Sequence, residues 1–337
     1  MPRMASEVER EDDLQAHIRH SGATSVAARV LAFGGFLAIL AIWTLKFGIP
    51  SDTVQIFVWL WGATIAWNIQ EPAQHHLGFI RDWWAPLLAL VLYFYGRGLA
   101  DELYAMPVAF TMPIDVDKWM FGGHLPTLWL QEQWCGSPCD PHSDARWFDL
   151  LFTLVYSTHF IFGLTLAVVL WLRNRVEWKK WMRRYIGLNF AGLAVYVLYP
   201  MAPPWMASRD GYMVGEEVVR LTSRGWGDTG MGRYHLILTG VGNPVAAMPS
   251  LHAGTAFLIS FYLISRFRNA WAWLSLLYPI VMSLGLIYYA EHYVIDTIAG
   301  AALAVAVILV CGWWERARGE TGAVREPEPA TSGVSEG

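Results

Sequence analysis

Charged residues are scarce in this chain. They make up 15% of the 337 positions, whereas hydrophobic residues make up 55%, and the charges gather between long apolar runs. This pattern excludes a soluble domain and predicts a polytopic membrane protein. The chain also lacks a basic stripe with interleaved aromatic residues, which excludes nucleic-acid binding.

Two other signals are missing. The N-terminus is acidic between Glu7 and Asp13, and its first apolar run starts near Val30 with no small-residue cleavage pattern, so we expect no secretory signal peptide. No internal repeat is evident, so an inverted-repeat transporter has no direct support. Of the three cysteines, Cys311 lies inside a hydrophobic run, which indicates a small packing residue.

Eight hydrophobic spans follow one another, each near the ~20 residues that a helix needs to cross a bilayer. They cover roughly residues 29–47, 53–70, 83–100, 148–172, 185–200, 250–266, 270–290 and 293–314. The sequence therefore predicts an all-α, polytopic membrane helix bundle over residues 29–314, with about eight transmembrane helices or a six-helix core. The polar segments 1–28 and 315–337 are expected to be disordered tails.

Basic residues predict the orientation, because Lys and Arg accumulate on the cytoplasmic side. The connection between the fourth and fifth spans is the most basic one, with Arg173, Arg175, Lys179, Lys180, Arg183 and Arg184. Placing it inside puts both tails in the cytoplasm and the loops 101–147 and 201–249 outside. Tryptophans then fall at the inner ends of spans, as an interfacial belt requires: Trp83, Trp84, Trp171, Trp178, Trp181, Trp271, Trp273, Trp313 and Trp314.

The stretch 242–300 holds the residues best suited to chemistry. It contains "GNPVAAMPSLHAG" and "YAEHYVIDTIAG", and the predicted orientation puts His252 and His292 on the same outer face. His292 and Asp296 are four residues apart, so on a helix they share a face and the carboxylate can hold an imidazole nitrogen. Ser250 can cap the following helix, whose first N–H groups can bind an anion. This pattern predicts phosphate chemistry with histidine as nucleophile or acid.

Other polar residues carry weaker signals. Glu291 points away from the face of His292, which indicates a solvated rim residue, and His159 lies in the middle of the fourth span, outside the predicted site. Cys135 and Cys139, in "CGSPC", suit a short disulfide. Free thiols, or a zinc site completed by His124 or His142, are the alternatives.

The two motifs resemble a known family. "PSLHAG" followed by "HYVID" is similar to the second and third signature motifs of the type 2 phosphatidic acid phosphatase superfamily, Ser-x-His-x-Gly and His-x-x-x-Asp. "AAMPSLHAG", "EHYVID" and "YPMAPPW" resemble its inositol phosphorylceramide synthase branch, and the likeness covers a catalytic core at about residues 80–314. The resemblance implies that His292 attacks phosphorus to form a phosphohistidine, that Asp296 orients it, and that His252 protonates the departing oxygen, with no metal and no cofactor.

The chain departs from that family in its phosphate-binding cations. The family's first motif supplies a Lys and an Arg before a Pro, and its third an Arg six residues ahead of the nucleophile, whereas this chain has "YPMAPPW" and Leu286. Ser250 and the arginines Arg97, Arg209, Arg224 and Arg233 are the candidate phosphate-binding residues. Fewer cations suit a phosphodiester donor with one negative charge, which favours a head-group transferase.

We therefore expect an integral membrane enzyme, in the plasma membrane, with an outward-facing site that moves a phosphoryl or phosphoalcohol group between lipid phosphoesters. The alternative is a lipid phosphate phosphatase of the phosphatidic acid or polyprenyl phosphate type, with water as acceptor. A third hypothesis is a lipid or ion transporter with Asp296 and His159 as a proton relay, which leaves Ser250 and His252 unexplained.

Overall fold

The computed structural model describes residues 26–47, 53–99, 106–222, 224 and 243–319. These residues form helices and the loops between them, with no strand in the described ranges. Two isolated bridges, Ala109 with Met201 and Met201 with Ala246, tie three loop segments together. The predicted all-α bundle is confirmed.

A helix occupies each of the eight expected ranges. They are Val26–Phe47, α2 Thr53–Trp67, α3 Ala73–Leu99, α6 Trp147–Arg173, α7 Arg175–Leu198, α10 Leu251–Phe267, the 3-10 helix η1 Ala270–Leu276 continued by α11 Leu277–Tyr288, and α12 Val294–Ala317. Three shorter helices lie in the loops, α4 Thr111–Met120, α5 Pro126–Trp134 and α8 Pro204–Arg209.

Not every one of these helices is long and apolar enough to cross a bilayer alone. Within the described residues four are: Val26–Phe47, Ala73–Leu99, Ala270–Tyr288 and Val294–Ala317. The halves of α6, Trp147–His159 and Ile161–Arg173, meet at 48° and make a fifth if they form one span. The helices α2 and α10 have 15 and 17 residues, short of the ~20 that a span needs. The chain is an integral membrane protein, and a count of eight spans stays a prediction.

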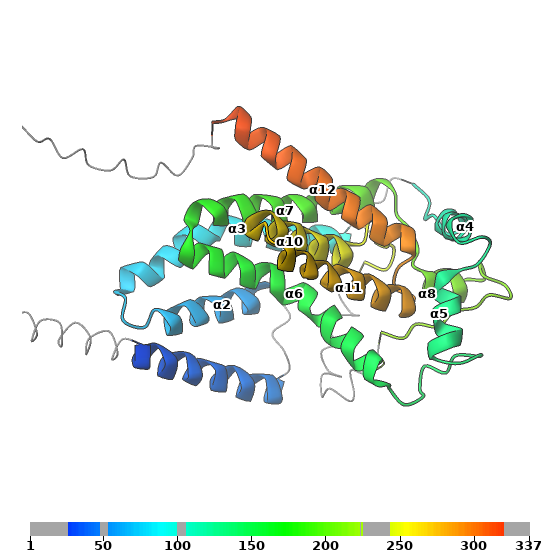
Figure 1. Cartoon of the computed structure of the whole chain (residues 1–337), viewed down its shortest axis with the longest axis horizontal. Coiled ribbons are helices and arrows are strands. Elements are labelled where there is room, and N and C mark those ends of the chain that lie inside the picture. The colour runs from blue at the N-terminus through cyan, green and yellow to red at the C-terminus, as the bar shows by residue number, and fades with distance from the viewer. Residues whose placement is uncertain (1–25, 48–52, 100–105, 223, 225–242, 320–337) are drawn as a thin grey trace, which may run out of the picture.

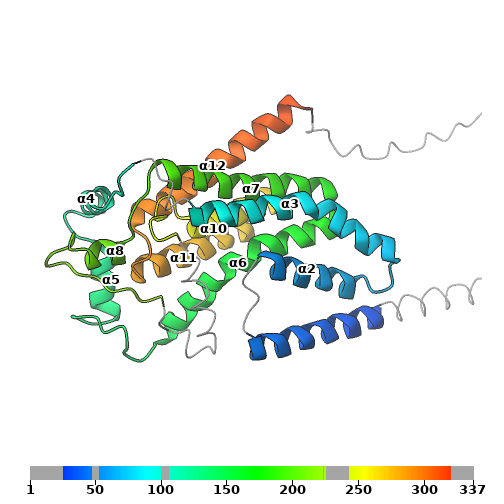
Figure 2. The same ribbon diagram turned by 180° about the vertical axis from the view of Figure 1, so that it is seen from behind.

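The helix α10 is central to the bundle. It packs against α6, α7, α11 and α12, while the helix Val26–Phe47 lies at the edge in both ribbon views (Figures 1 and 2). The short helices α4, α5 and α8 gather at one end of the long axis (Figure 1). This end also holds the starts of α10 and α12, which carry the two sequence motifs.

Four tryptophans of the expected interfacial belt lie in the core instead. Trp83, Trp171, Trp178 and Trp181 are each at most 5% exposed. Trp83 stacks on Phe79 and contacts Trp178, with ring centres 4.9 and 5.5 Å apart. The belt prediction is wrong for these four, because their rings fill the space where α3, α6 and α7 meet.

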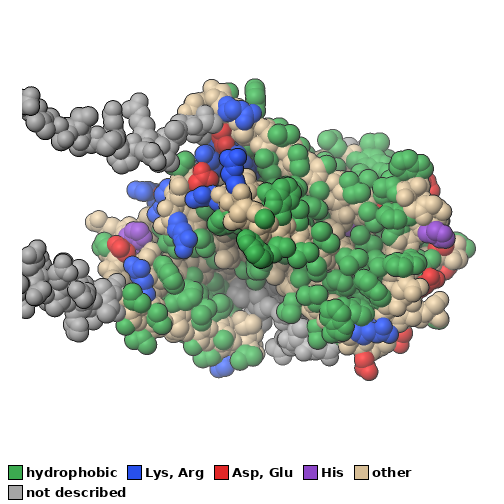
Figure 3. Space-filling model, viewed as in Figure 1, with side chains coloured by type: hydrophobic (Ala, Val, Ile, Leu, Met, Phe, Trp, Pro, Cys, Tyr) green, Lys and Arg blue, Asp and Glu red, His purple; other side chains and the backbone are tan. Residues whose placement is uncertain are grey.

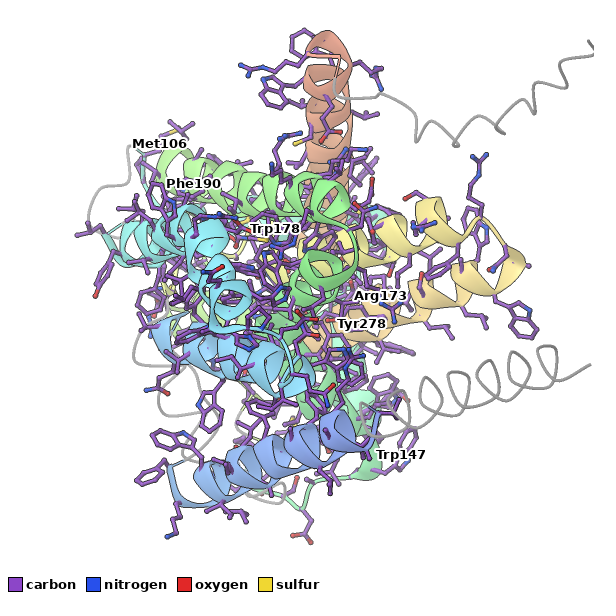
Figure 4. All side chains as sticks on the ribbon, turned by 90° about the vertical axis from the view of Figure 1, so that its left-hand side faces the viewer. Met106, Trp147, Arg173, Trp178, Phe190 and Tyr278 are labelled. Atoms are coloured by element: carbon purple, nitrogen blue, oxygen red, sulfur yellow. A yellow bond between two sulfur atoms is a disulfide. The ribbon has the colours of Figure 1, made fainter. Side chains whose placement is uncertain are left out.

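The opposite end of the bundle is basic. The connection between α6 and α7 lies there, and most of the Lys and Arg side chains visible in Figure 3 are in that half of the molecule. Figure 4 views the molecule from this end and labels Arg173. Arg183 and Arg184 hold the buried Glu315 of α12 at 2.5 and 2.7 Å, which fixes α7 against α12.

Candidate active site

The start of α10 presents His252. Ser250 is the N-cap of this helix, and its hydroxyl accepts a hydrogen bond from the backbone N–H of Ala253 at 3.3 Å, as the sequence predicts. The hydroxyl of Tyr196 on α7 donates to the carbonyl of Pro249 at 2.8 Å and fixes the preceding loop. His252 therefore projects from the first turn of α10, and hydrogen bonds fix both the N-cap of this helix and the loop before it.

The start of α12 presents His292 and Asp296. The chain leaves α11 through Ala290, whose backbone is left-handed with φ 59°, and α12 begins only at Val294. His292 is therefore not on the helix that carries Asp296, and the expected pairing along one helix face is wrong. The two side chains meet because Asp296 Oδ2 folds back, accepting the N–H of Tyr293 at 2.9 Å and lying 3.4 Å from His292 Nδ1.

Asp117 on α4 holds this helix start from outside. Its two carboxylate oxygens accept the N–H groups of Val294 and Ile295 at 2.9 and 3.0 Å, which satisfies donors that the first turn of a helix leaves free. Burial raises the pKa of Asp117 to about 6, the two backbone hydrogen bonds act against that rise, and the charge of Asp296 adds to it. Sequence reasoning missed Asp117, since no spacing links it to α12.

The helices α10 and α12 cross at two glycines. A Cβ on Gly300 would lie 2.3 Å from the carbonyl oxygen of Ser250, and a Cβ on Gly254 would lie 3.1 Å from the carbonyl oxygen of Gly300. The Ser250 N–H also donates to the Asp296 carbonyl at 2.9 Å. Small residues allow helices in membranes to approach this closely. The crossing brings the two motifs to one place.

Three histidines meet beside this crossing. The ring centre of His252 lies 5.9 Å from that of His292, and on its other sides the rings of Tyr156 and His159, both on α6, lie 4.8 and 4.2 Å away. All four side chains line a cavity of about 260 Å³. His159, expected to lie outside the site, is part of its wall; it is the last residue before the bend in α6, and its ring contacts that of His252.

Of the candidate arginines that the structure describes, one lines the cavity. Arg97 on α3 lines it, as does Arg220, which sequence reasoning did not consider. Arg209 is exposed and pairs with Asp210 at 2.6 Å. Arg224 is buried against Asp149 at 3.4 Å and does not line the cavity, nor does Ser250. Arg233 lies outside the described residues.

Arg97 and Arg220 differ in their partners. Arg97 forms no ion pair with any residue in the described ranges, and its guanidinium contributes to the positive field around His159 and His252. Arg220 donates from Nε and Nη2 to the two oxygens of Glu291 at 2.6 and 3.2 Å. Glu291 was expected to be a solvated rim residue, but its side chain is only 12% exposed. Among the described residues, the cavity therefore holds one unpaired cation and one neutralised ion pair.

The cysteine pair lies at the end of α5. Cys135 and Cys139 form a disulfide, which confirms the favoured prediction, and Cys311 is a free, buried thiol. Arg224 donates to Cys135 Sγ at 3.2 Å and to the Asp144 carbonyl at 2.8 Å. These two hydrogen bonds join Arg224 to the loop between α5 and α6, which contains the disulfide. The described residues contain no group of three or more side chains placed to hold a metal, which gives the zinc alternative no support.

Comparisons with known proteins point to one family. A family model described as "PAP2 superfamily" matches residues 130–310. An inositol phosphorylceramide synthase of Candida albicans is 28% identical over 173 residues, 47% of this chain and 35% of that protein. A phosphoinositol dihydroceramide synthase of Bacteroides thetaiotaomicron is 28% identical over 159 residues, 43% of this chain and 48% of that protein. The chain thus spans less than half the length of either relative, and no solved structure matches.

Proposed function

The chain belongs to the PAP2 superfamily, and from this premise we propose that it is a membrane enzyme that transfers a phosphoalcohol head group from one lipid to another. The observation that carries this proposal is the meeting of His252, His292 and Asp296 at one cavity. The two relatives are named as an inositol phosphorylceramide synthase and a phosphoinositol dihydroceramide synthase, and a synthase name favours transfer over hydrolysis. Family membership does not support the transporter alternative.

The chemistry follows from the two nitrogens of His292. His292 Nδ1 lies 3.4 Å from the Asp296 carboxylate, and a carboxylate in this position favours the tautomer with the proton on Nδ1, so that Nε2 carries the lone pair that attacks phosphorus. The N–P bond forms while the bond from phosphorus to the diacylglycerol oxygen breaks, and His252 gives that oxygen a proton. The head group stays on His292 as a phosphohistidine monoester, with one P–N bond to the histidine and one P–O bond to the head-group alcohol.

The second half-reaction reverses the roles. His252, now neutral, takes the proton of an incoming alcohol, whose oxygen attacks phosphorus while the N–P bond breaks. The new phosphodiester leaves and His292 is restored. Water in place of the alcohol releases the head-group phosphate, which is the phosphatase alternative.

The charges in the cavity suit a phosphodiester. Arg97 is the one cation lining the cavity that no carboxylate of the described ranges neutralises. It can balance the single charge of a phosphodiester, whereas a phosphomonoester brings up to two negative charges. Substrate charge therefore favours a glycerophospholipid donor over phosphatidic acid or a polyprenyl phosphate.

The site is proposed to face outward in the plasma membrane, with both termini in the cytoplasm. The basic connection between α6 and α7 lies at the far end of the bundle from α4, α5 and α8 (Figure 1), and basic connections favour the cytoplasm. The site residues run from Arg97 to Asp296, within the proposed catalytic core at residues 80–314.

The test is a turnover assay on the purified full chain in detergent. Phosphatidylinositol with a labelled head group is offered with and without a ceramide acceptor, and both the new lipid and the released head-group phosphate are measured. New lipid that requires the acceptor supports the transferase; release of head-group phosphate irrespective of the acceptor supports the phosphatase. His292→Ala abolishes both products if the proposal is right, and normal turnover by that variant refutes it.

A further inference from the structure

One wall of the cavity is built from side chains that phosphoryl transfer does not use. Trp205 on α8, Arg220 and Glu291 line the cavity together with His292. The guanidinium of Arg220 lies 4.6 Å from the centre of the Trp205 ring and pairs with Glu291 through two hydrogen bonds. Thr222 also donates to this carboxylate. Such a network holds its side chains in fixed positions when they are paired.

This wall lies where the group attached to phosphorus must be. Glu291 directly precedes His292 in the chain, and the backbone N–H of Trp205 donates to the carbonyl of Ala290 at 3.1 Å. The wall and the nucleophile are therefore fixed to the same short segment. Because both line one cavity, a head group bonded to phosphorus on His292 is within reach of this wall.

The wall has unused hydrogen-bonding capacity. The indole N–H of Trp205 is buried and has no hydrogen-bond partner among the described residues. Arg220 uses two of its five N–H donors on Glu291. From the described residues the carboxylate accepts twice at Oε1 and once at Oε2, so they leave about one of its four acceptor positions open. Free donors beside a free acceptor match hydroxyl groups, each of which donates and accepts.

The charges of this wall do not favour a cationic head group. A choline or ethanolamine group needs a free carboxylate or an open aromatic face. Here Glu291 is neutralised by Arg220, Asp296 is paired with His292, and Arg220 and Arg209 both lie over the Trp205 ring. With Arg97 left for the phosphate, the wall presents no net charge to its ligand.

We propose that Trp205, Arg220 and Glu291 form a subsite for a neutral, polyhydroxylated head group, and that this subsite selects the donor lipid. The inference rests on the proposed function, because the subsite holds the head group while the first lipid leaves and the acceptor enters. The cavity of about 260 Å³ is just below the roughly 300–1,000 Å³ of pockets for drug-sized ligands, so it suits the head group and leaves the acyl chains outside.

The test compares two phosphodiester donors with the same diacylglycerol, phosphatidylinositol and phosphatidylcholine, on the full chain in detergent. The wild-type enzyme is expected to prefer phosphatidylinositol by roughly 10²-fold or more in kcat/KM, because hydrogen-bonding groups left unpaired by the wrong ligand penalise it. Glu291→Gln and Trp205→Phe each lower this ratio roughly 10-fold, since each removes hydrogen bonds to hydroxyl groups. The ratio is independent of the fraction of folded enzyme.

Matched variants control for the substitutions themselves. Glu217→Gln changes an exposed glutamate of the same loop, and Trp119→Phe changes an exposed tryptophan of α4; both residues lie outside the cavity. Both are expected to keep the wild-type ratio. A wild-type ratio near one overturns the subsite, as do Glu291→Gln and Trp205→Phe variants that lower kcat/KM equally for both donors. In those cases the proposed function stands, whereas a wild-type enzyme that turns over neither donor overturns both.

Discussion

The crossing of α10 and α12 provides the sharpest test of how the site is assembled. In Gly300→Ala the new Cβ would lie 2.3 Å from the carbonyl oxygen of Ser250. Carbon and oxygen approach no closer than about 3.3 Å, so α12 must move away from α10 by about 1 Å. The obstructing atom is backbone and cannot turn aside as a flexible side chain can.

This shift separates His292 from His252, because each lies beside the start of one of the two helices. A misplacement of about 1 Å can cost roughly 10²-fold in rate, and overpacking costs about 1–3 kcal/mol of stability. We expect kcat/KM to fall by about that factor, while the variant still purifies as a folded protein. Initial rates and thermal unfolding in detergent measure both effects.

Gly78→Ala is the matched control. Gly78 lies within α3, and a Cβ there meets nothing within 4 Å. The substitution makes the same chemical change and the same gain in helix propensity, so activity should be unchanged. If Gly300→Ala retains activity within about threefold of this control, the close crossing does not set the catalytic geometry.

Three further predictions concern charge, pH and sidedness. Arg97→Gln should lower kcat/KM for a phosphodiester donor roughly 10²–10³-fold. Arg81→Gln changes an exposed arginine towards the other end of α3 and should leave kcat/KM unchanged. Equal kcat/KM values for the two variants would show that Arg97 does not bind the phosphate. Because burial raises the pKa of Asp117 to about 6, the folded state binds an extra proton between about pH 4 and pH 6, and this group's contribution to stability is lost as the pH rises through that window. The unfolding temperature of the wild type relative to D117N should therefore fall from pH 4 to pH 6 and level off above it; a constant difference would refute this titration. After mild reduction of the disulfide, a membrane-impermeant maleimide should label Cys135 and Cys139 on intact cells, and labelling only after permeabilisation would reverse the orientation.

Local spacing predicted much of the bundle and the reactive residues. Apolar runs located a helix in each of eight ranges, and the short distance from Ser250 to His252 and from His292 to Asp296 predicted two helix starts with reactive side chains. These features depend on neighbours within about one helical turn. The spacing did not predict that His292 precedes the helix that carries Asp296, because the residue at which α12 begins cannot be located from the spacing alone.

The surroundings of the site could not be predicted in this way. Asp117 reaches α12 across 177 positions, and Arg220 reaches Glu291 across 71. Such contacts depend on the way in which the long loops fold over the bundle. The periodicity of hydrophobic residues in the sequence carries no information about them. Likewise, a tryptophan at the end of a span can face lipid or core, and only packing separates Trp83 from the exposed Trp84.

The central claim is that His292 carries the head group between two lipids. The direct measurement is rapid denaturation of the enzyme during turnover of phosphatidylinositol without acceptor, followed by mass spectrometry of the peptide that contains His292. The account predicts a phosphoinositol adduct on His292 that disappears when acceptor is added and is absent in His292→Ala. An adduct on another residue, or steady turnover with no adduct on an enzyme whose His292→Ala variant remains active, would contradict it.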